Sequence, residues 1–273
     1  MIAKHLIDEG VDVHAQGGRF GNALQAASYG GHEAITKLLI KKGADLNARG
    51  GHYGNALQAA SYGGHEAIAK LLIEKGADVN AQGGFYGNAL QAASYGGHET
   101  IINLLMEKGA DVHAQGGQYE NALRAASYEG HEAITQLLIN EGADVNAQGG
   151  LYENALQAAS YGGHEAIVKL LIDEGVNVHA QGGEFGNALQ AASYESHEAI
   201  VKLLIDEGVD VNAQGGDYGN ALQATSYAGH EAISQLLIGK GADVNAQGGD
   251  YGNALQVASY GGHEAIVKLL IDE

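Results

Sequence analysis

Apolar residues recur along the chain in two short patterns that alternate. In the first pattern, Leu24 and Ala27 lie on one side of a segment that ends near residue 29, which predicts a short helix. In the second, Ile35, Leu38 and Leu39 have the spacing i, i+3 and i+4, which predicts an amphipathic helix. Helices this short are not stable alone in water. Packing between neighbouring units must therefore stabilise them.

Residues at the ends of these segments support the same reading. Asn22 stands where an N-cap is expected, and Glu33 places a negative charge in the first turn of the second helix. The Gly30-Gly31 pair interrupts the chain between the two helices, and Gly43 is expected to end the second one in a left-handed conformation. Residues 44–53 then form a glycine-rich projecting turn, called the finger below.

The whole pattern occurs eight times without insertion or deletion. A histidine that precedes the second helix marks each copy, and consecutive copies lie 33 residues apart: His32, His65, His98, His131, His164, His197, His230 and His263. A fixed period of this length predicts an all-α stacked array. We expect a single domain over residues 1–273, in which 1–20 are a partial unit that opens on a second helix. Residues 21–273 hold eight repeats, the last of which lacks its finger.

The repeat resembles the ankyrin repeat. Gly64-His65 and the run Gly-Ala-Asp-Val-Asn-Ala at residues 76–81 stand as that family writes them. The resemblance implies a right-handed α-solenoid of helix-turn-helix units with projecting β-turn fingers. The family's Thr-Pro-Leu-His is replaced by Asn-Ala-Leu-Gln, as at residues 55–58, and its turn Asp and Gly become Gly50 and Tyr53. We expect Asn and Gln to make the cap hydrogen bonds that Thr and Pro would otherwise support.

The amino-acid sequence of the repeat is most similar to those of ankyrin arrays in fungal NACHT-type multidomain proteins. In those proteins the array commonly follows a nucleotide-binding domain and acts as a sensing surface, although no nucleotide-binding segment lies in this sequence. The copies are so alike that a consensus-based or trimmed array is an alternative origin.

The resemblance implies a non-catalytic module that binds a protein or peptide through its concave face and finger tips. Three rows of residues are candidates for this surface or its support. The residue before each finger aromatic, called the tip residue, comprises Arg19, His52, Phe85, Gln118, Leu151, Glu184, Asp217 and Asp250. The helix tyrosines, which border the concave face in the family, are Tyr29, Tyr62, Tyr95, Tyr128, Tyr161, Tyr194, Tyr227 and Tyr260. The finger aromatics are Phe20, Tyr53, Tyr86, Tyr119, Tyr152, Phe185, Tyr218 and Tyr251.

The three rows carry different expectations. For the finger aromatics we favour stacking of repeat on repeat over recognition. For the helix tyrosines the two roles are equally supported, because tyrosine offers a large contact area at low entropy cost. The tip residues run from basic to acidic, which predicts an elongated ligand whose basic end lies over residues 184–250. Drift at an unconstrained exposed position is the alternative.

The charge of the chain points to the same class of partner. The formal net charge is −19, and phosphate binding needs clustered Lys and Arg, so nucleic acid is not an expected partner. Residues 1–136 carry 10 basic and 14 acidic groups, and residues 137–273 carry 4 and 19. This asymmetry favours a partner with a basic segment for the second half. Acidic surfaces that only maintain solubility are the alternative.

No residues are arranged for catalysis, a cofactor or a metal. The chain has no cysteine, and the marker histidines are too far apart to share an ion, since packed helices lie roughly 8–10 Å apart. The family resemblance implies that each bonds backbone at its helix start. His14, His113 and His179 occupy an Asn position of the finger and are expected to serve the turn. Residues 243–250 lack the spacing of a calcium loop, and residues 17–21 lack that of a phosphate loop. We therefore predict that the protein is not an enzyme.

The sequence also carries expectations about environment and assembly. It has no long apolar stretch or signal segment, which predicts a soluble, intracellular, cytoplasmic protein that does not contact membranes. Neither end resembles a polar cap, which repeat arrays normally need. We expect end-to-end self-association, or continuation into a longer array. The runner-up function is a structural or designed array with no natural ligand.

Overall fold

A computed structural model describes residues 11–272, and the expected helix at residues 2–9 lies outside that range. The described part contains sixteen α-helices, α2 to α17, and one two-stranded antiparallel sheet. This confirms the prediction of an all-α fold built from repeated helix-turn-helix units. The chain divides into two compact units. The first holds Met1–Ala126 and Leu137–Ala143, and the second holds Ser127–Gln136 and Asp144–Glu273.

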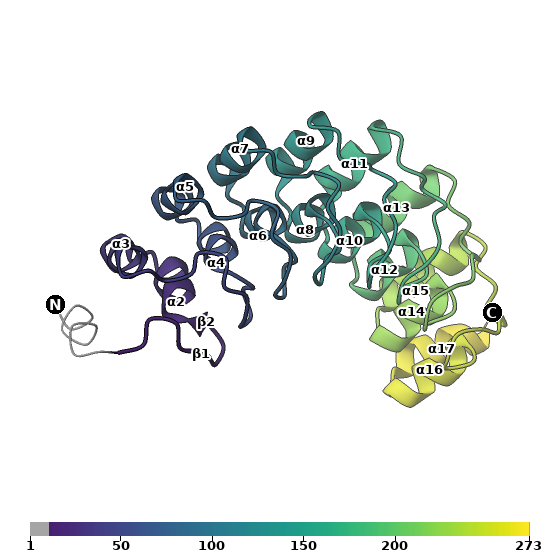
Figure 1. Ribbon diagram of the computed structural model, residues 1–273. Helices are drawn as coiled ribbons and strands as arrows, with labels where there is room; N and C mark the ends of the chain where they lie inside the picture. The colour runs from purple at the N-terminus through teal and green to yellow at the C-terminus, as the bar shows by residue number, and fades with distance from the viewer. Residues whose placement is uncertain (1–10, 273) are drawn as a thin grey trace. The chain divides into compact units, whose positions relative to one another are not determined.

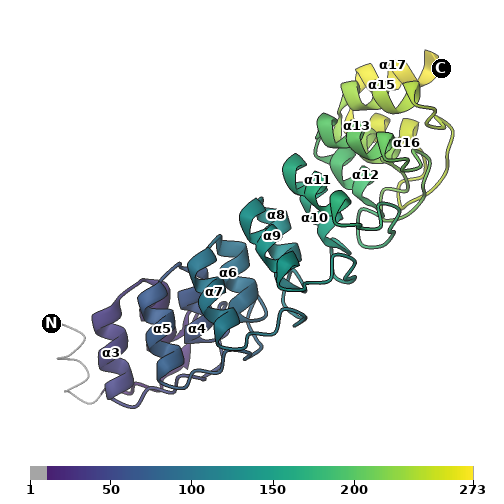
Figure 2. The same cartoon turned by 90° about the horizontal axis from the view of Figure 1, so that it is seen from above.

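The helices of the first unit form two layers (Figure 1). The first helix of each repeat lies in one layer: α2 (Ala23–Tyr29), α4 (Ala56–Tyr62) and α6 (Ala89–Gly96). The second helices lie side by side in the other layer, as Figure 2 shows: α3 (Glu33–Lys41), α5 (Glu66–Glu74) and α7 (Glu99–Glu107). Strands β1 (Gln16–Gly17) and β2 (Gly21–Asn22) form the first finger.

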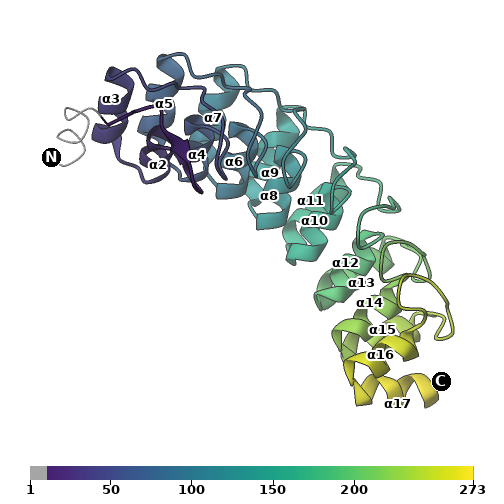
Figure 3. The same cartoon turned by 60° about the horizontal axis from the view of Figure 1, so that its bottom comes forward.

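The second unit repeats the arrangement. Its first helices follow one another in Figure 3: α10 (Ala155–Gly162), α12 (Ala188–Tyr194), α14 (Ala221–Ala228) and α16 (Ala254–Gly261). Its second helices are α11 (Glu165–Asp173), α13 (Glu198–Asp206), α15 (Glu231–Gly239) and α17 (Glu264–Asp272). Helices α8 (Ala122–Glu129) and α9 (Glu132–Asn140) contribute residues to both units.

The core of each repeat lies between its helices and those of its neighbours. In α4 every residue before Tyr62 is buried, because neighbouring first helices cover both flanks of a helix made of small residues. Helix α5 buries only the face that carries Ile68, Ala69 and Leu72, and its opposite face is polar. This difference explains why the first helix is rich in alanine while the second is amphipathic.

The predicted helix boundaries are confirmed. Helix α2 ends at Tyr29, α3 begins at Glu33, and Gly43 has a φ of +85° after α3. The predicted Asn cap is also present, since the Asn55 side chain accepts a hydrogen bond of 2.9 Å from the backbone N–H of Gln58. The local signals that start and stop each helix therefore act as the sequence indicated.

Candidate functional site

Six of the described fingers are held at the base by a glutamine of the preceding repeat: Gln25, Gln58, Gln91, Gln157, Gln190 or Gln223. The buried Gln58 side chain donates through Nε2 to the carbonyl oxygens of Ala81, Gly83 and Gly87, at 3.1, 3.2 and 2.8 Å. Gln190 and Gln223 make the corresponding three contacts in the second unit. Sequence reasoning assigned this glutamine only to its own helix cap. Its contacts with the next repeat lie 23–29 residues further along the chain.

The glycine before each Asn cap leaves room for this glutamine. A Cβ atom on Gly54 would lie 1.9 Å from Oε1 of Gln58. In the second unit this position holds Glu153, with a φ of +55°, and Gln157 makes a single hydrogen bond of 3.4 Å to the next finger. Gln157 therefore holds its finger by one contact, whereas Gln58, Gln190 and Gln223 hold theirs by three.

The tip residues of successive fingers are joined backbone to backbone. In the first unit the N–H of His52 donates to the carbonyl of Arg19 at 2.7 Å, and Phe85 donates to His52 at 2.7 Å. In the second unit Asp217 donates to Glu184 and Asp250 donates to Asp217, both at 2.8 Å. The tip residues thus form a continuous row in each unit. Their backbone hydrogen bonds are alike although their side chains differ in chemistry.

The tip side chains point to solvent to different degrees. Arg19, Phe85, Gln118, Leu151, Asp217 and Asp250 are exposed, whereas His52 and Glu184 are half-buried. His52 stacks on Phe85 with ring centroids 4.8 Å apart. Burial, together with the nearby Arg19 guanidinium, holds the pKa of His52 below its ordinary value. The first unit therefore presents a basic and aromatic row, and the second presents Leu151 followed by three acidic residues.

The helix tyrosines and finger aromatics interlock. Tyr29 stacks on Tyr53 at 4.6 Å and Tyr62 stacks on Tyr86 at 4.7 Å, while Tyr53 and Tyr86 are themselves 6.3 Å apart. Burial, followed by a hydrogen bond to Tyr29, raises the pKa of Tyr53 above its ordinary value. The stacking expected of the finger aromatics is present. The helix tyrosines stack too, yet those of the inner repeats keep half-exposed rims.

One pair in the second unit departs from this pattern. Phe185 takes the place of a finger tyrosine and has no hydroxyl to offer Tyr161. The Tyr161 hydroxyl instead donates to the carboxylate of Glu195, which stands where most repeats have glycine. Burial, followed by this hydrogen bond, raises the pKa of Tyr161. A carboxylate is thereby held beside the aromatic rims of the second unit.

The marker histidines are structural, but their partner differs from the expectation. The Nε2–H of His65 donates to the carbonyl of Tyr29 at 2.7 Å, at the end of the preceding repeat's first helix. His65 makes no side-chain bond at the start of its own helix, so that assignment was wrong. The ring also packs on the preceding turn, where a Cβ atom on Gly31 would lie 2.6 Å from the His65 ring. His65, His98, His164, His197, His230 and His263 each join two repeats in this way.

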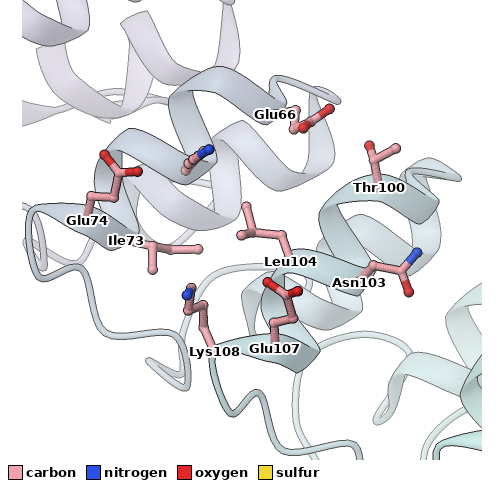
Figure 4. A pocket seen from close by; sticks show the side chains of 9 residues that line it. Glu66, Ile73, Glu74, Thr100, Asn103, Leu104, Glu107 and Lys108 are labelled. Carbon is pink, nitrogen blue, oxygen red and sulfur yellow. The ribbon is translucent and has the colours of Figure 1, made fainter.

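The outer helices carry a groove that sequence reasoning did not single out. It lies between α5 and α7 and has a volume of about 400 Å³ (Figure 4). Ile73 and Leu104 lie along it, with Thr100 and Asn103 on the α7 side. These last two residues replace an alanine and, in most repeats, a longer Lys or Gln. An equivalent groove lies between α15 and α17, where Ala265 and Lys268 keep the usual residues, so these two substitutions do not account for the groove.

Residues 11–272 contain no group of three or more His, Cys, Asp or Glu side chains that could hold a metal ion. Over the same part of the chain, every helix is too short or too polar to cross a membrane.

Comparison with protein families matches the family described as ankyrin repeats (3 copies) over residues 1–83, 84–149, 122–215 and 189–273. A comparison with curated proteins gives no match. The family match spans the whole chain and agrees with the repeated helix pairs and glycine-rich fingers. The chain therefore belongs to the ankyrin repeat family.

Proposed function

We propose that the protein is a non-catalytic module that binds an extended peptide segment of a protein partner along its finger tips and helix tyrosines. Ankyrin repeats are generally protein–protein interaction modules and typically act as non-catalytic scaffolds. The observation that carries the proposal for this chain is the row of tip residues. Within each unit their backbones are hydrogen-bonded in series, while along the sequence their side chains change from Arg to Asp.

The spacing of the fingers supports an extended ligand. Finger aromatics of neighbouring repeats in the second unit are 5.9–6.2 Å apart. An extended chain advances about 6.6 Å for every two residues. Alternate side chains of a bound peptide would therefore meet successive tips without a large change of register.

The acidic tips support a basic segment at the second unit. Glu184, Asp217 and Asp250 follow one another in the row, and Glu195 adds a fourth carboxylate beside Tyr161. The half-exposed rims of Tyr194 and Tyr227 lie in the same unit. Lys or Arg side chains of a peptide would find both carboxylates and aromatic faces there. The preferred peptide has a basic residue at every second position.

Two peptides of equal composition test this proposal. One carries three Lys residues at alternate positions, and the other carries them consecutively between Gly residues. The alternating peptide should bind more tightly. Replacing Glu184, Asp217 and Asp250 by Asn or Ser should weaken its binding about three- to tenfold and flatten the salt dependence.

A matched variant separates the tips from bulk charge. Asp173, Glu174 and Glu207 are exposed on the second helices of the same unit, and replacing them removes the same number of charges. That variant should bind almost as the original does. Equal weakening by both variants would mean that only net charge attracts the peptide. If no displayed peptide library yields a binder, the structural or designed array becomes the preferred function.

A second proposal concerns self-association. Leu255, Tyr260 and Ile271 of the last repeat are exposed by 38%, 82% and 66%, whereas Leu222 of the preceding repeat is 1% exposed. Large exposed apolar residues favour association. We infer that this face binds a second copy of the chain. Sedimentation over a range of protein concentrations tests it, and a strict monomer at the highest concentration would contradict it.

The resemblance to fungal NACHT-type arrays adds a finer proposal, in which the array is the sensing surface of a larger protein. Sequencing of the gene around this segment tests it. A neighbouring nucleotide-binding domain is the expected result, and its absence would favour a designed or trimmed array.

A further inference from the structure

In four of the described fingers an asparagine side chain links its repeat to the next one. Oδ1 of Asn80 accepts from the N–H of Asp111 at 2.9 Å, while its Nδ2 donates to the carbonyl of Gly109 at 2.9 Å. Asn212 makes the same two contacts with Asp243 and Gly241, at 2.8 and 3.0 Å. One primary carboxamide therefore forms hydrogen bonds with both a backbone N–H and a backbone carbonyl of the neighbouring loop.

Asn47 and Asn146 follow the same rule less completely. Asn47 accepts from Asp78 at 2.8 Å and donates weakly to Gly76 at 3.5 Å. Asn146 accepts from the N–H of Asn177 at 2.7 Å. The contact with the backbone N–H is thus common to all four asparagines, so that N–H is the feature of the neighbouring loop that they share.

Histidine replaces this asparagine in two described repeats whose neighbouring loop belongs to the same unit. His14 precedes the loop of Gly43 and Asp45 in the first unit, and His179 precedes the loop of Gly208 and Asp210 in the second. No hydrogen bond within residues 11–272 reaches the N–H of Asp45 or Asp210. Likewise, no side chain of that part donates to the carbonyl of Gly43 or Gly208.

A cavity adjoins Asp45, and another adjoins Asp210, each on the side of the preceding repeat's histidine. The first has a volume of about 230 Å³ and is lined by residues that include His14, Gln16 and Asp45. The second, of about 310 Å³, is lined by residues that include His179, Gln181 and Asp210. The two cavities involve equivalent positions of the repeat, so the same substitution accompanies the same opening in two separate parts of the chain.

We propose that each cavity binds the side-chain carboxamide of an Asn or Gln residue from a protein partner. The chain itself shows the fit, because Asn80 and Asn212 place a carboxamide on the equivalent backbone N–H and carbonyl. A carboxylate lacks the N–H that the glycine carbonyl requires, and it would lie near Asp45 or Asp210. A trans secondary amide presents its N–H and C=O in opposite directions, so the backbone of a partner does not match.

These sites are distinct from the surface proposed above. None of their lining residues is a tip residue, a helix tyrosine or a finger aromatic. A partner that lies along the tips is therefore not required for the carboxamide sites, and each proposal can fail without the other.

Nuclear magnetic resonance of the full chain tests the sites with small probes. N-acetyl-asparagine N-methylamide is the probe, and the corresponding leucine and aspartate compounds are controls of similar size. The asparagine compound should shift the backbone amide resonances of Asp45 and Asp210. The amides of Asp78, Asp111 and Asp243, which an Asn already occupies, should not move. Equal shifts with the leucine compound, or no shift at Asp45 and Asp210, would overturn the proposal.

Two variants make the test reciprocal. Replacing both histidines, His14→Asn and His179→Asn, should fill the cavities from within, abolish the shifts and slow hydrogen exchange at Asp45 and Asp210 about tenfold. Replacing Asn80→His should create a new responsive amide at Asp111. If Asn80→His leaves Asp111 unresponsive while the chain stays folded, the carboxamide is not what the loop recognises.

Discussion

A finger of the first unit and one of the second are held by nearly identical contacts. The tip N–H of His52 donates to the preceding tip at 2.7 Å, and that of Asp217 does so at 2.8 Å. The finger aromatics below them stack on the preceding ring at 6.2 and 5.9 Å. The exposed chemistry nevertheless differs completely, from an imidazole stacked on Phe85 to a row of carboxylates. The comparison teaches that scaffold and surface are encoded at separate positions of the repeat.

The largest expected effect comes from the core, where the two units should respond alike. Leu72 and Leu171 are fully buried at the same position of α5 and α11. Replacing either by Ala should lower the free energy of unfolding by about 2–5 kcal/mol, because a cavity remains. Hydrogen exchange should show the loss mainly in the unit that carries the substitution, since repeats contact only their neighbours.

The Met variants at these positions are controls, because Met fills nearly the same volume and should cost less than about 1.5 kcal/mol. Equal loss of protection in both units from either Ala variant would show that the units unfold as one.

A comparable effect is expected at a finger glycine, Gly51, and a smaller one at Gly43, which follows α3. Gly51 has a φ of +62°, and a Cβ atom there would lie 2.5 Å from the backbone of Gly21. Gly43 has a φ of +85° but open space around it. Changing Gly43 to Ala should cost about 1–2 kcal/mol from backbone conformation alone. Changing Gly51 to Ala should cost about 2–5 kcal/mol, because a close contact between fingers adds to that strain.

The second unit offers the same pair in Gly183 and Gly175, where only Gly183 is close to the preceding finger. Denaturant unfolding of the four Ala variants measures the differences. Equal costs for Gly51 and Gly43 would mean that the fingers separate easily, and the continuous row of tips would lose its support.

The Tyr161–Glu195 hydrogen bond sharpens the contrast between the units. Changing Glu195 to Gln should cost about 0.5–1.5 kcal/mol, because solvent screens this half-exposed contact. The cost of Glu195→Gln should be smaller when Phe185 is also changed to Tyr. The Tyr161 hydroxyl then has a tyrosine beside it to bond with, as Tyr62 has Tyr86. A double-mutant cycle measures the coupling. Strictly additive effects would contradict the exchange of partners.

The same tyrosines give a pH dependence. Burial raises the pKa of Tyr161 in the folded protein above the ordinary value of about 10. The stability that this raised pKa contributes is fully present below the pKa of Tyr161 in the unfolded chain. It is lost as the pH rises through the pKa of Tyr161 in the folded protein. Stability should therefore fall above about pH 10, and less steeply after Tyr161 is changed to Phe.

The smallest effect is expected on the second helices. In the second unit Lys169 forms an ion pair with Glu165, and both side chains are about half exposed. In the first unit no ion pair within the described chain joins Lys70 to Glu66. Changing Glu165 to Gln should cost about 0.3–0.5 kcal/mol at low salt. Changing Glu66 to Gln should cost almost nothing. A reversal of this order in thermal unfolding would contradict the assignment of the pair.

The features that the sequence predicted are those that local chemistry decides. Asn55 caps its helix because its side chain needs only the N–H three residues later. The partner of His65 and the three acceptors of Gln58 lie in a neighbouring repeat, and nothing in one copy of the motif places them. The stacking of finger aromatics on one another was expected. Their contact with the helix tyrosines was not, because it depends on where each finger lies relative to the first helices. The departures at His14 and His179 could be read from the sequence, and each accompanies a cavity.

The backbone bonds between tips have a consequence for how such a surface changes over generations. Within each unit, the N–H and C=O of an inner tip bind its two neighbours, whatever side chain the residue carries. A codon change at one tip therefore alters a single contact and leaves the spacing of the others intact. Duplication, loss or exchange of a whole 33-residue segment lengthens, shortens or reorders the row in steps of one contact. If the tips bind a partner as proposed, its specificity changes one position at a time.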